Sequence, residues 1–321
     1  MYKMYNYLIR RLLLVIPTLL GMTIIVFTLI HLLPGNFVDV MLGTQRGMIT
    51  PEQVQALYRT YGLDKPLPLQ YLTWLSSAIR GNMGCSLRTG RPVLEEIISR
   101  FPVTAELTLV ATLIGVLIGI SLGIFSAISR NRVIDFIARL LGLIGLSIPK
   151  FWLGIIIILV LSSYFNWMPP GGSLINPLKD PLGNFSQIIF PALTLGLGMA
   201  AEVMRIARSS MLEVLNQDYV TTAYSKGLSE LVIWFKHCLK NALIPILTFI
   251  GIQVGYLLGG AVVVEAVFSL PGIGRLLLNS IYQRDYSLVQ GTVLFITFNF
   301  VLINLITDIL YAAVDPRIRY E

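Results

Sequence analysis

The sequence predicts an all-helical, polytopic membrane protein with six transmembrane helices and a small extracytoplasmic subdomain after the first span. Hydrophobic residues make up 55% of the 321-residue chain and charged residues only 13%, too few to cover a soluble domain of this size. The apolar residues form six runs, each near the roughly 20 residues that a bilayer-crossing helix needs. Basic residues flank these runs instead of forming one stripe, which favours a role in membrane orientation over nucleic-acid binding.

The first apolar run, Leu12 to Leu33, follows a short basic N-terminus that contains Arg10 and Arg11. A cleaved signal peptide has a shorter apolar core of about 7 to 15 residues and ends at a small-residue cleavage site. This run has spanning length and ends at Pro34-Gly35. We therefore expect residues 1–34 to hold a cytoplasmic N-terminal end and a retained first transmembrane helix.

Residues 35–102 form the longest polar region, which we assign to an extracytoplasmic loop subdomain. Thr50 can cap a helix that has Pro51 at its first position, and Gly62 marks the end of this helix. The amphipathic stretch Leu69 to Ile79, which carries Trp74, predicts a second short helix. The role of this subdomain stays open. It either only covers the ends of the helices or has a more specific function.

Five further spans follow within residues 103–312, at Val103 to Ile128, Ala138 to Phe165, Gln187 to Ile206, Ala242 to Glu265 and Leu288 to Ala312. The turn Ser129 to Arg139 carries three arginines, and the central polar stretch and the tail at residues 313–321 are basic as well. Short cytoplasmic loops carry an excess of lysine and arginine, so we expect both termini and the central stretch to be cytoplasmic.

The central stretch, Asp218 to Pro245, carries helix signals at both ends. We expect Asp218 to cap a helix that begins at Tyr219 and Gly227 to close it, because glycine tolerates the left-handed backbone of a helix exit. A second helix is predicted from Leu228, with an apolar stripe that packs it against the spans. The stripe consists of Leu228, Leu231, Val232, Phe235 and Leu239. The alternative is an amphipathic loop lying on the membrane surface.

A resemblance favours the first interpretation. Thr222-Ala223-x-x-Lys226-Gly227-Leu228-Ser229, followed by His237-x-Leu239-x-Asn241-Ala242-Leu243-Ile244-Pro245, resembles the coupling segment of ATP-binding-cassette (ABC) importer permeases. The similarity is greatest to the branch that moves dipeptides, oligopeptides and nickel. The segment YGLDKPLPLQY, the segment Glu265 to Leu276 and the ending Asp315-Pro316-Arg317-Ile318-Arg319 resemble the same branch. Together these similarities cover nearly the whole chain.

The resemblance implies a type I ABC importer permease fold over residues 103–312, with a cytoplasmic coupling segment at residues 212–241. It implies four partners: a homologous second permease, two ABC ATPase subunits and an extracytoplasmic solute-binding protein. The residues expected to couple to the ATPase are Asp218, Tyr219, Thr222, Ala223, Lys226, Gly227 and Leu228. The sequence has Thr221-Thr222-Ala223 where the wider family often has Glu-Ala-Ala, so the resemblance implies a short helix and not a particular ion pair.

The chain contains no Gly-x-x-x-x-Gly-Lys-Ser/Thr phosphate loop, so we expect it to be a transport subunit and not an enzyme. ATP and Mg²⁺ are expected on the partner ATPases, with no cofactor on this chain. His31 and His237 have no cluster of metal ligands around them, and Cys85 and Cys238 lie on opposite membrane sides in the predicted topology, which excludes a disulfide.

Polar residues within spans are costly in hydrocarbon and often face a cavity, so Lys150, Gln253 and Asn299 are candidates for the translocation path. For each, a contact with a neighbouring helix is the competing explanation. We expect uptake of dipeptides or short oligopeptides across the cytoplasmic membrane by alternating access. A nickel or glutathione importer of the same branch stays open, as does, from another class, an ion-coupled secondary transporter.

Overall fold

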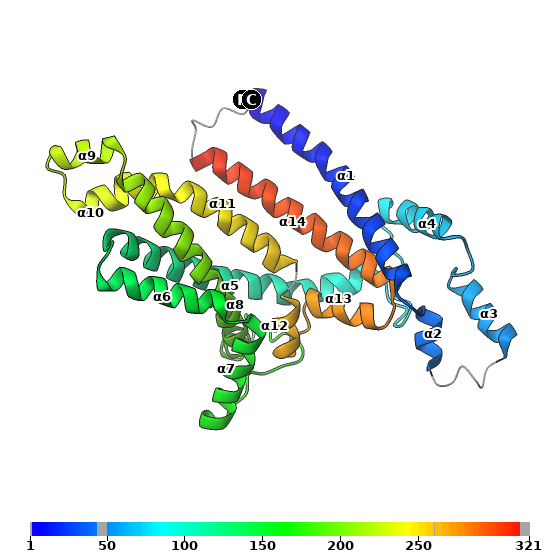
Figure 1. The fold of residues 1–321 in the computed structure, drawn as a ribbon. Helices are drawn as coiled ribbons and strands as arrows, with labels where there is room; N and C mark the ends of the chain where they lie inside the picture. The colour runs from blue at the N-terminus through cyan, green and yellow to red at the C-terminus, as the bar shows by residue number, and fades with distance from the viewer. Residues whose placement is uncertain (1, 44–49, 260, 315–321) are drawn as a thin grey trace. The chain divides into compact units, whose positions relative to one another are not determined.

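The computed structural model describes residues 2–43, 50–259 and 261–314, and Figure 1 shows this part of the chain as helices joined by loops. One isolated antiparallel bridge joins Cys85 and Pro92. The chain divides into two compact units, of which the first comprises Met1–Val103 and Pro271–Asn299. The second comprises Thr104–Leu270 and Phe300–Glu321. Each unit is described by itself below.

The helices follow one another as α1 (Tyr2–Leu32), α2 (Phe37–Leu42), α3 (Pro51–Thr60), α4 (Leu67–Ile79), α5 (Val93–Ile128), α6 (Val133–Ser147), α7 (Lys150–Phe165), α8 (Pro181–Leu215), α9 (Asp218–Ser225), α10 (Glu230–Val232), a π-helical segment (Ile233–Cys238), α11 (Leu239–Leu258), α12 (Val262–Val267), α13 (Ile273–Tyr282) and α14 (Tyr286–Val314).

Five continuous helical segments among the described residues are long and apolar enough to cross a membrane, and the pair α6 and α7 supplies a sixth if it counts as one bent span. The continuous ones are Leu13–Leu32, Val93–Ile128, Pro181–Leu215, Glu230–Leu258 and Tyr286–Ile309. The prediction of an all-helical polytopic chain is therefore confirmed, with each predicted span represented.

The third span is broken by a bend of 97° between α6 and α7. Ile148 has the extended backbone (ψ 121°) that the residue before a proline prefers, and Pro149 precedes the first residue of α7. Proline also lacks the N–H group that would continue the hydrogen-bond ladder of α6. The sequence places this break at one dipeptide, whereas its angle depends on packing.

The predicted fifth span, Ala242 to Glu265, is wrong at its C-terminal end. Helix α11 stops at Leu258 with Gly259 as its C-cap, and Glu265 belongs to the separate short helix α12. Glycine loses more backbone entropy in a helix than any other residue, which makes this a favourable place for the helix to end. The apolar run continues beyond the glycine, so hydropathy alone could not mark the boundary.

In the first unit, the two short helices predicted after the first span are present as α3 and α4. Thr50 caps α3 in a capping box with Gln53, and Gly62 follows the helix with φ +67°. An additional helix, α2, begins with a second capping box, between Asn36 and Asp39. A buried cluster of Val93, Ile97, Ile273, Leu276 and Leu288 joins the N-terminal part of α5 to α13 and the start of α14.

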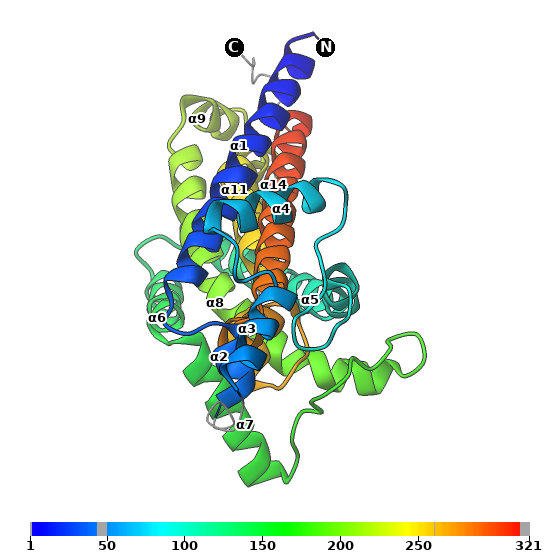
Figure 2. The same cartoon turned by 90° about the vertical axis from the view of Figure 1, so that its right-hand side faces the viewer.

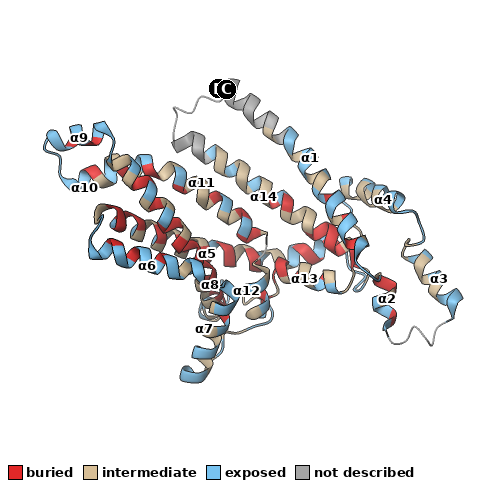
Figure 3. Cartoon of the chain, in the orientation of Figure 1, coloured by how far each residue is buried: buried red, intermediate tan, exposed pale blue. Residues whose placement is uncertain are grey.

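In the second unit, α8 is the most buried of the candidate spans, with 67% of its apolar window inside the protein, and Figure 3 shows its buried residues in red. Glycines at four-residue spacing on α5, namely Gly115, Gly119 and Gly123, face α8. A Cβ atom on Gly119 would lie 2.7 Å from the Cβ of Val203. The missing side chains let the two helices approach closely, as small residues do between membrane helices.

Candidate functional site

The candidate site lies at the short helix α9, which follows the end of α8 in the second unit and is joined through α10 to α11 (Figure 1). The prediction that Asp218 caps this helix is wrong. Gln217 occupies the cap position without a side-chain hydrogen bond, and Asp218 is the first helical residue. Its carboxylate still lies in the first turn, where the helix dipole favours negative charge. The helix therefore begins one residue earlier than predicted.

The C-terminal end of α9 is closed as predicted. Gly227 has φ +74°, its N–H donates to the carbonyl oxygen of Tyr224 (2.9 Å), and the N–H of Leu228 donates to that of Ala223 (3.4 Å). This pair of hydrogen bonds is a Schellman motif, which requires a left-handed residue at the glycine position. Lys226 is the C-cap residue. The glycine is therefore needed for its backbone conformation, because a Cβ there would meet no atom within 4 Å.

One face of α9 is buried in the second unit. Val220 and Ala223 have relative exposures of 0% and 7% and belong to one hydrophobic cluster. The other buried members of this cluster are Ile124 and Ala127 of α5, Met211 of α8, Ile233 and Cys238 of the π-helical segment, and Ala242 of α11. Helix α9 is thus packed against parts of three candidate spans, and a displacement of α9 would act on all three.

The opposite face of α9 is exposed, and Figure 3 draws the exposed residues of this helix in pale blue. Among the predicted coupling residues, Asp218, Tyr219, Thr222, Lys226, Gly227 and Leu228 are exposed, whereas Ala223 is buried. The hydroxyl of Tyr219 accepts a hydrogen bond of 2.7 Å from Nδ2 of Asn241 on α11. The structure therefore divides the predicted residues into an outward-facing group and one packing residue.

The predicted apolar stripe of the second helix does not pack as expected. Leu231 and Phe235 are 63% and 49% exposed, whereas Ile233 and Cys238 are fully buried. The prediction assumed an α-helix throughout, but Ile233–Cys238 is π-helical. A π-helical turn contains more residues than an α-helical one and rotates the side chains that follow it. The buried face therefore differs from the one that a 3.6-residue period selects.

A polar network that sequence reasoning missed lies close to this cluster and centres on Asp135 of α6, which is fully buried. Its carboxylate accepts two hydrogen bonds from Arg208 of α8, from Nε (2.8 Å) and Nη2 (3.0 Å). It also accepts from the hydroxyl of Ser126 (2.6 Å) and the N–H of Asn131 (3.1 Å), with Arg139 Nε at 3.5 Å. Bidentate arginine–carboxylate pairs are strong and geometrically specific, so this network fixes α5, α6 and α8 together.

A signal for this network was present in the sequence. Asp135 is the one acidic residue in helix α6, whose other residues are apolar apart from Arg139 and Ser147, and an isolated acidic residue near a membrane segment usually has a buried partner. The partner could not be identified, because Arg208 lies 73 residues further along the chain.

The three candidate translocation residues are not brought together. Lys150 begins α7 and, with Gly198 and Met204, lines a mainly apolar cavity of about 280 Å³. Gln253 does not line this cavity. Gln253 is half-buried on α11. Asn299 lies in the first unit, where its Nδ2 donates to the carbonyl oxygen of Phe295 one turn earlier (2.8 Å). For Asn299, the structure thus provides a partner within its own helix.

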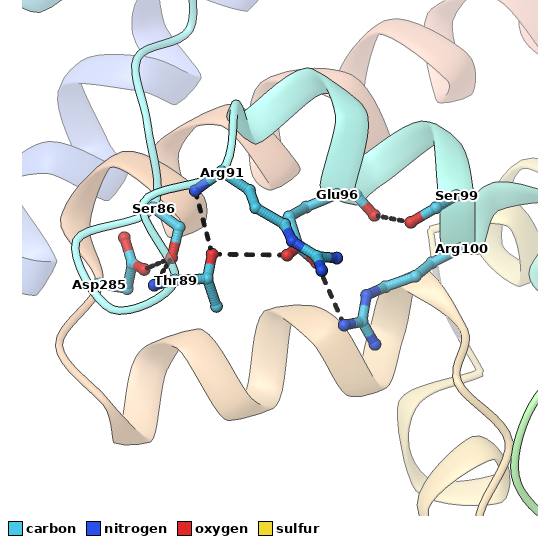
Figure 4. A network of polar contacts seen from close by, with 7 residues as sticks. All are labelled: Ser86, Thr89, Arg91, Glu96, Ser99, Arg100 and Asp285. Carbon is cyan, nitrogen blue, oxygen red and sulfur yellow. Dashed lines mark hydrogen bonds and ion pairs between the residues drawn. The ribbon is translucent and has the colours of Figure 1, made fainter.

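A second polar network lies in the first unit and is drawn in Figure 4. The carboxylate of Asp285 accepts from the hydroxyl of Ser86 (2.5 Å) and from the N–H of Leu288 (3.1 Å), so that it caps α14. In the same network Glu96 forms an ion pair of 3.2 Å with Arg100. The hydrogen bond between Ser86 and Asp285 attaches the loop before α5 to the start of α14.

Comparison with known proteins decides the family. Residues 119–320 match the family described as "Binding-protein-dependent transport system inner membrane component", and residues 4–108 match the corresponding N-terminal family. The chain belongs to this family of ABC importer permeases. The permease is 40% identical over 318 residues to the glutathione transport system permease protein GsiC of Escherichia coli (strain K12), covering 99% of this chain and 100% of the relative. It is also 40% identical over 338 residues to the dipeptide transport system permease protein DppB of Alkalihalophilus pseudofirmus, with the same coverage.

Solved structures agree on the fold. The permease resembles a chain of the inward-facing MetNI methionine ABC transporter with a TM-score of 0.57 and 19% identity, covering 69% of this chain and 97% of that one. A chain of an amino acid ABC transporter gives a TM-score of 0.52 at 18% identity, covering 70% and 95%. The predicted importer permease fold is therefore confirmed.

Family membership makes this chain the non-catalytic transmembrane component of an ABC transporter complex in the inner membrane. ATP is bound by the ATPase subunits of such a complex, and the permease itself holds no cofactor. Among its described residues, no group of three or more His, Cys, Asp or Glu side chains is placed to hold a metal ion.

Proposed function

We propose that this permease moves dipeptides or short oligopeptides into the cytoplasm by alternating access, driven by two ABC ATPases that dock on the exposed face of α9. The observation that supports coupling between the ATPases and the spans is the way α9 is packed. Its outer face is exposed, and its inner residues Val220 and Ala223 are packed against α5, α8 and α11. A force applied to the outer face passes into three spans through a close-packed cluster.

The names of the relatives support the substrate class. One is a glutathione transport permease and another a dipeptide transport permease, each 40% identical to this chain over its whole length. Glutathione is itself a short peptide derivative, so the two names share a chemistry of amide bonds and free carboxylates. We assign dipeptides and short oligopeptides as the principal substrates, and glutathione is the second candidate.

The proposed complex contains a homologous second permease and an extracytoplasmic solute-binding protein that delivers the peptide. In the proposed orientation both termini and α9 face the cytoplasm, which agrees with the excess of arginine and lysine in the short loops on that side. Residues 35–102 then lie outside the membrane and residues 103–312 form the transport domain.

For the translocation path, Lys150 is the strongest of the three candidates. It is exposed at the broken third span and borders a cavity, where a cation could attract a peptide carboxylate. Gln253 offers an amide on a half-buried position of α11. Asn299 is retained as a weaker candidate, because its amide already donates to its own helix.

The coupling proposal is tested by replacing Gly227 with valine. A β-branched residue is strained at φ +74°, so the end of α9 should rearrange and ATP hydrolysis should continue with at least a fivefold loss of dipeptide uptake. A matched control is Gly172→Val, because Gly172 has φ +89°, has no atom within 4 Å of a built Cβ, and lies in the loop after α7. Uptake and ATPase rates are measured in proteoliposomes that contain the whole complex. Coupled uptake at the wild-type ratio in Gly227→Val would contradict the proposal.

The energy source and the substrate are tested in cells. Uptake of a labelled dipeptide should stop on ATP depletion and persist when the proton gradient is dissipated, whereas a secondary transporter would show the reverse pattern. Competition with unlabelled glutathione, nickel and dipeptides then orders the candidate substrates. Stronger competition by glutathione than by any dipeptide would favour the second candidate.

A further inference from the structure

The first unit contains a cavity of about 250 Å³ between the C-terminal part of α1, the helix α4 and the start of α14. Figure 2 shows α4 lying across α1, and their contact includes a hydrogen bond of 2.9 Å between the hydroxyls of Thr23 and Tyr71. The cavity is large enough to hold several water molecules. It is slightly smaller than the roughly 300 Å³ at which sites for drug-sized ligands begin. Its size suits a small ligand or the end of a longer one.

His31 lines this cavity and carries a hydrogen-bond acceptor that has no partner among the described residues. Its Nδ1 lies 2.8 Å from the carbonyl oxygen of Phe27, and a carbonyl can only accept, so Nδ1 carries the proton. In the neutral ring Nε2 is then an acceptor, and this atom is buried without a hydrogen bond among the described residues. The ring lies between Phe27 and Tyr286, with centroids at 4.1 Å and 4.6 Å, which holds it in place.

Trp74 carries a hydrogen-bond donor that likewise has no partner among the described residues. Its Nε1–H is buried and also has no partner within the described part of the chain, and Trp74 lines the same cavity as His31. Buried indole N–H groups usually find an acceptor. A ligand that satisfies both atoms must offer one hydrogen-bond donor and one acceptor, and a peptide amide offers both, through its N–H and its carbonyl oxygen.

The charges of the residues that line the cavity restrict the class of ligand further. Lys65, which is exposed, is the single charged residue among those that line the cavity, and none of them carries a carboxylate. A carboxylate of the ligand would therefore have a cationic partner, whereas a ligand ammonium group would have no acidic partner. Aromatic side chains of Phe27, Tyr61 and Tyr286 complete the wall and favour an apolar side chain.

We propose that this cavity is a binding site on the permease for the carboxyl-terminal end of a short peptide, with the terminal amide at His31 and Trp74 and the terminal carboxylate at Lys65. The site is additional to the proposed translocation residues and, in the proposed orientation, lies on the extracytoplasmic side. Its assignment to peptides rests on the proposed function.

The first test measures the affinity of three related peptides for the full chain in lipid nanodiscs by calorimetry. The probes are L-alanyl-L-phenylalanine, its N-acetyl derivative and its C-terminal amide. The free dipeptide and the N-acetyl form should bind within about threefold of each other, and the C-terminal amide about tenfold more weakly, as expected for loss of a charged hydrogen bond. Equal affinity for the acid and the amide, or no binding to the wild-type chain, would overturn the proposal.

Two variants locate the binding. Lys65→Gln should abolish the preference for the free acid, whereas Lys179→Gln, at an exposed lysine of the second unit, should leave it unchanged. Trp74→Phe should weaken binding about fivefold by removing the N–H group, and Trp167→Phe, at a tryptophan whose ring makes a tilted contact with Phe190 in the second unit, should not. Binding that is unaffected by both Lys65→Gln and Trp74→Phe would place the peptide elsewhere and refute the inference.

Uptake by the whole complex separates this inference from the proposed function. The inference predicts that Lys65→Gln raises the KM for the dipeptide with kcat unchanged, because the contact concerns binding and not the ATP-driven step. If the wild-type complex imports no peptide, the proposed function fails. If it imports peptide with the same KM in Lys65→Gln and Trp74→Phe, only the present inference fails.

Discussion

Asp135 and His31 are both polar residues enclosed by helices, but their surroundings differ. The carboxylate of Asp135 accepts hydrogen bonds from Arg208, Ser126 and the backbone of Asn131. The imidazole of His31 uses one nitrogen within its own helix and leaves the other without a partner in a cavity. The first arrangement fixes three helices in one geometry. The second has hydrogen-bonding capacity left for a ligand.

The contrast extends to packing. In the second unit, α5 and α8 approach so closely at Gly119 that an added Cβ would lie 2.8 Å from the carbonyl oxygen of Ala200. In the first unit, Gly21 of α1 has no atom within 4 Å of the same position. The close-packed contact between α5 and α8 suits the transmission of force from α9, whereas Gly21 lies on an open face of α1. Substitutions in the two regions should therefore differ in size and even in sign.

The largest effect is expected for Asp135→Ala. It leaves the guanidinium of Arg208, whose side chain is 22% exposed, without its carboxylate, and breaking such a pair should cost about 3 kcal/mol of folding stability. Thermal unfolding of the permease in nanodiscs measures this loss. The double variant Asp135→Leu with Arg208→Leu should recover most of the stability, because no unpaired charge remains. A single variant as stable as the wild type would show that the network does not hold the helices.

A smaller effect of opposite sign in the two regions is expected for glycine-to-alanine substitutions. Gly119→Ala should destabilise the protein by about 1 to 3 kcal/mol, because the new methyl group overlaps Val203. Gly21→Ala should stabilise α1 by up to about 1 kcal/mol, since alanine is the better helix former and meets no neighbour. The same unfolding assay compares the two variants. A change in stability of the same sign in both variants would contradict the difference in packing between the two regions.

The smallest effect on stability is expected for His31→Phe. Phenylalanine keeps the aromatic contacts with Phe27 and Tyr286 and has no acceptor to leave unsatisfied, so stability should change by less than about 0.5 kcal/mol. Binding of L-alanyl-L-phenylalanine should nevertheless weaken about tenfold, because the amide N–H loses its acceptor. Calorimetry and thermal unfolding on one preparation test both statements. A large loss of stability with unchanged peptide affinity would assign His31 a purely structural role.

Much of the candidate site could be predicted from local sequence. Gly227 closes α9, and Thr50, Pro51 and Gly62 delimit α3, because capping and left-handed backbone conformations depend on a few neighbouring residues. The prediction failed where the structure departs from a local rule. Gln217 occupies the cap position of α9 although Asp218 is the better capping residue, and the π-helical segment Ile233–Cys238 altered the face that an α-helical period selects.

By itself the sequence determined the apolar segments long enough to cross a membrane, the break at Pro149 and the helix-closing role of Gly227. These follow from hydropathy over about 20 residues and from the backbone limits of proline and glycine, which are local properties. Only the tertiary structure decided that Asp135 pairs with Arg208, and that His31 and Trp74 line one cavity. These partners are far apart along the chain, and a hydrogen bond is fixed by positions within a few tenths of an ångström, which the packing of whole helices sets.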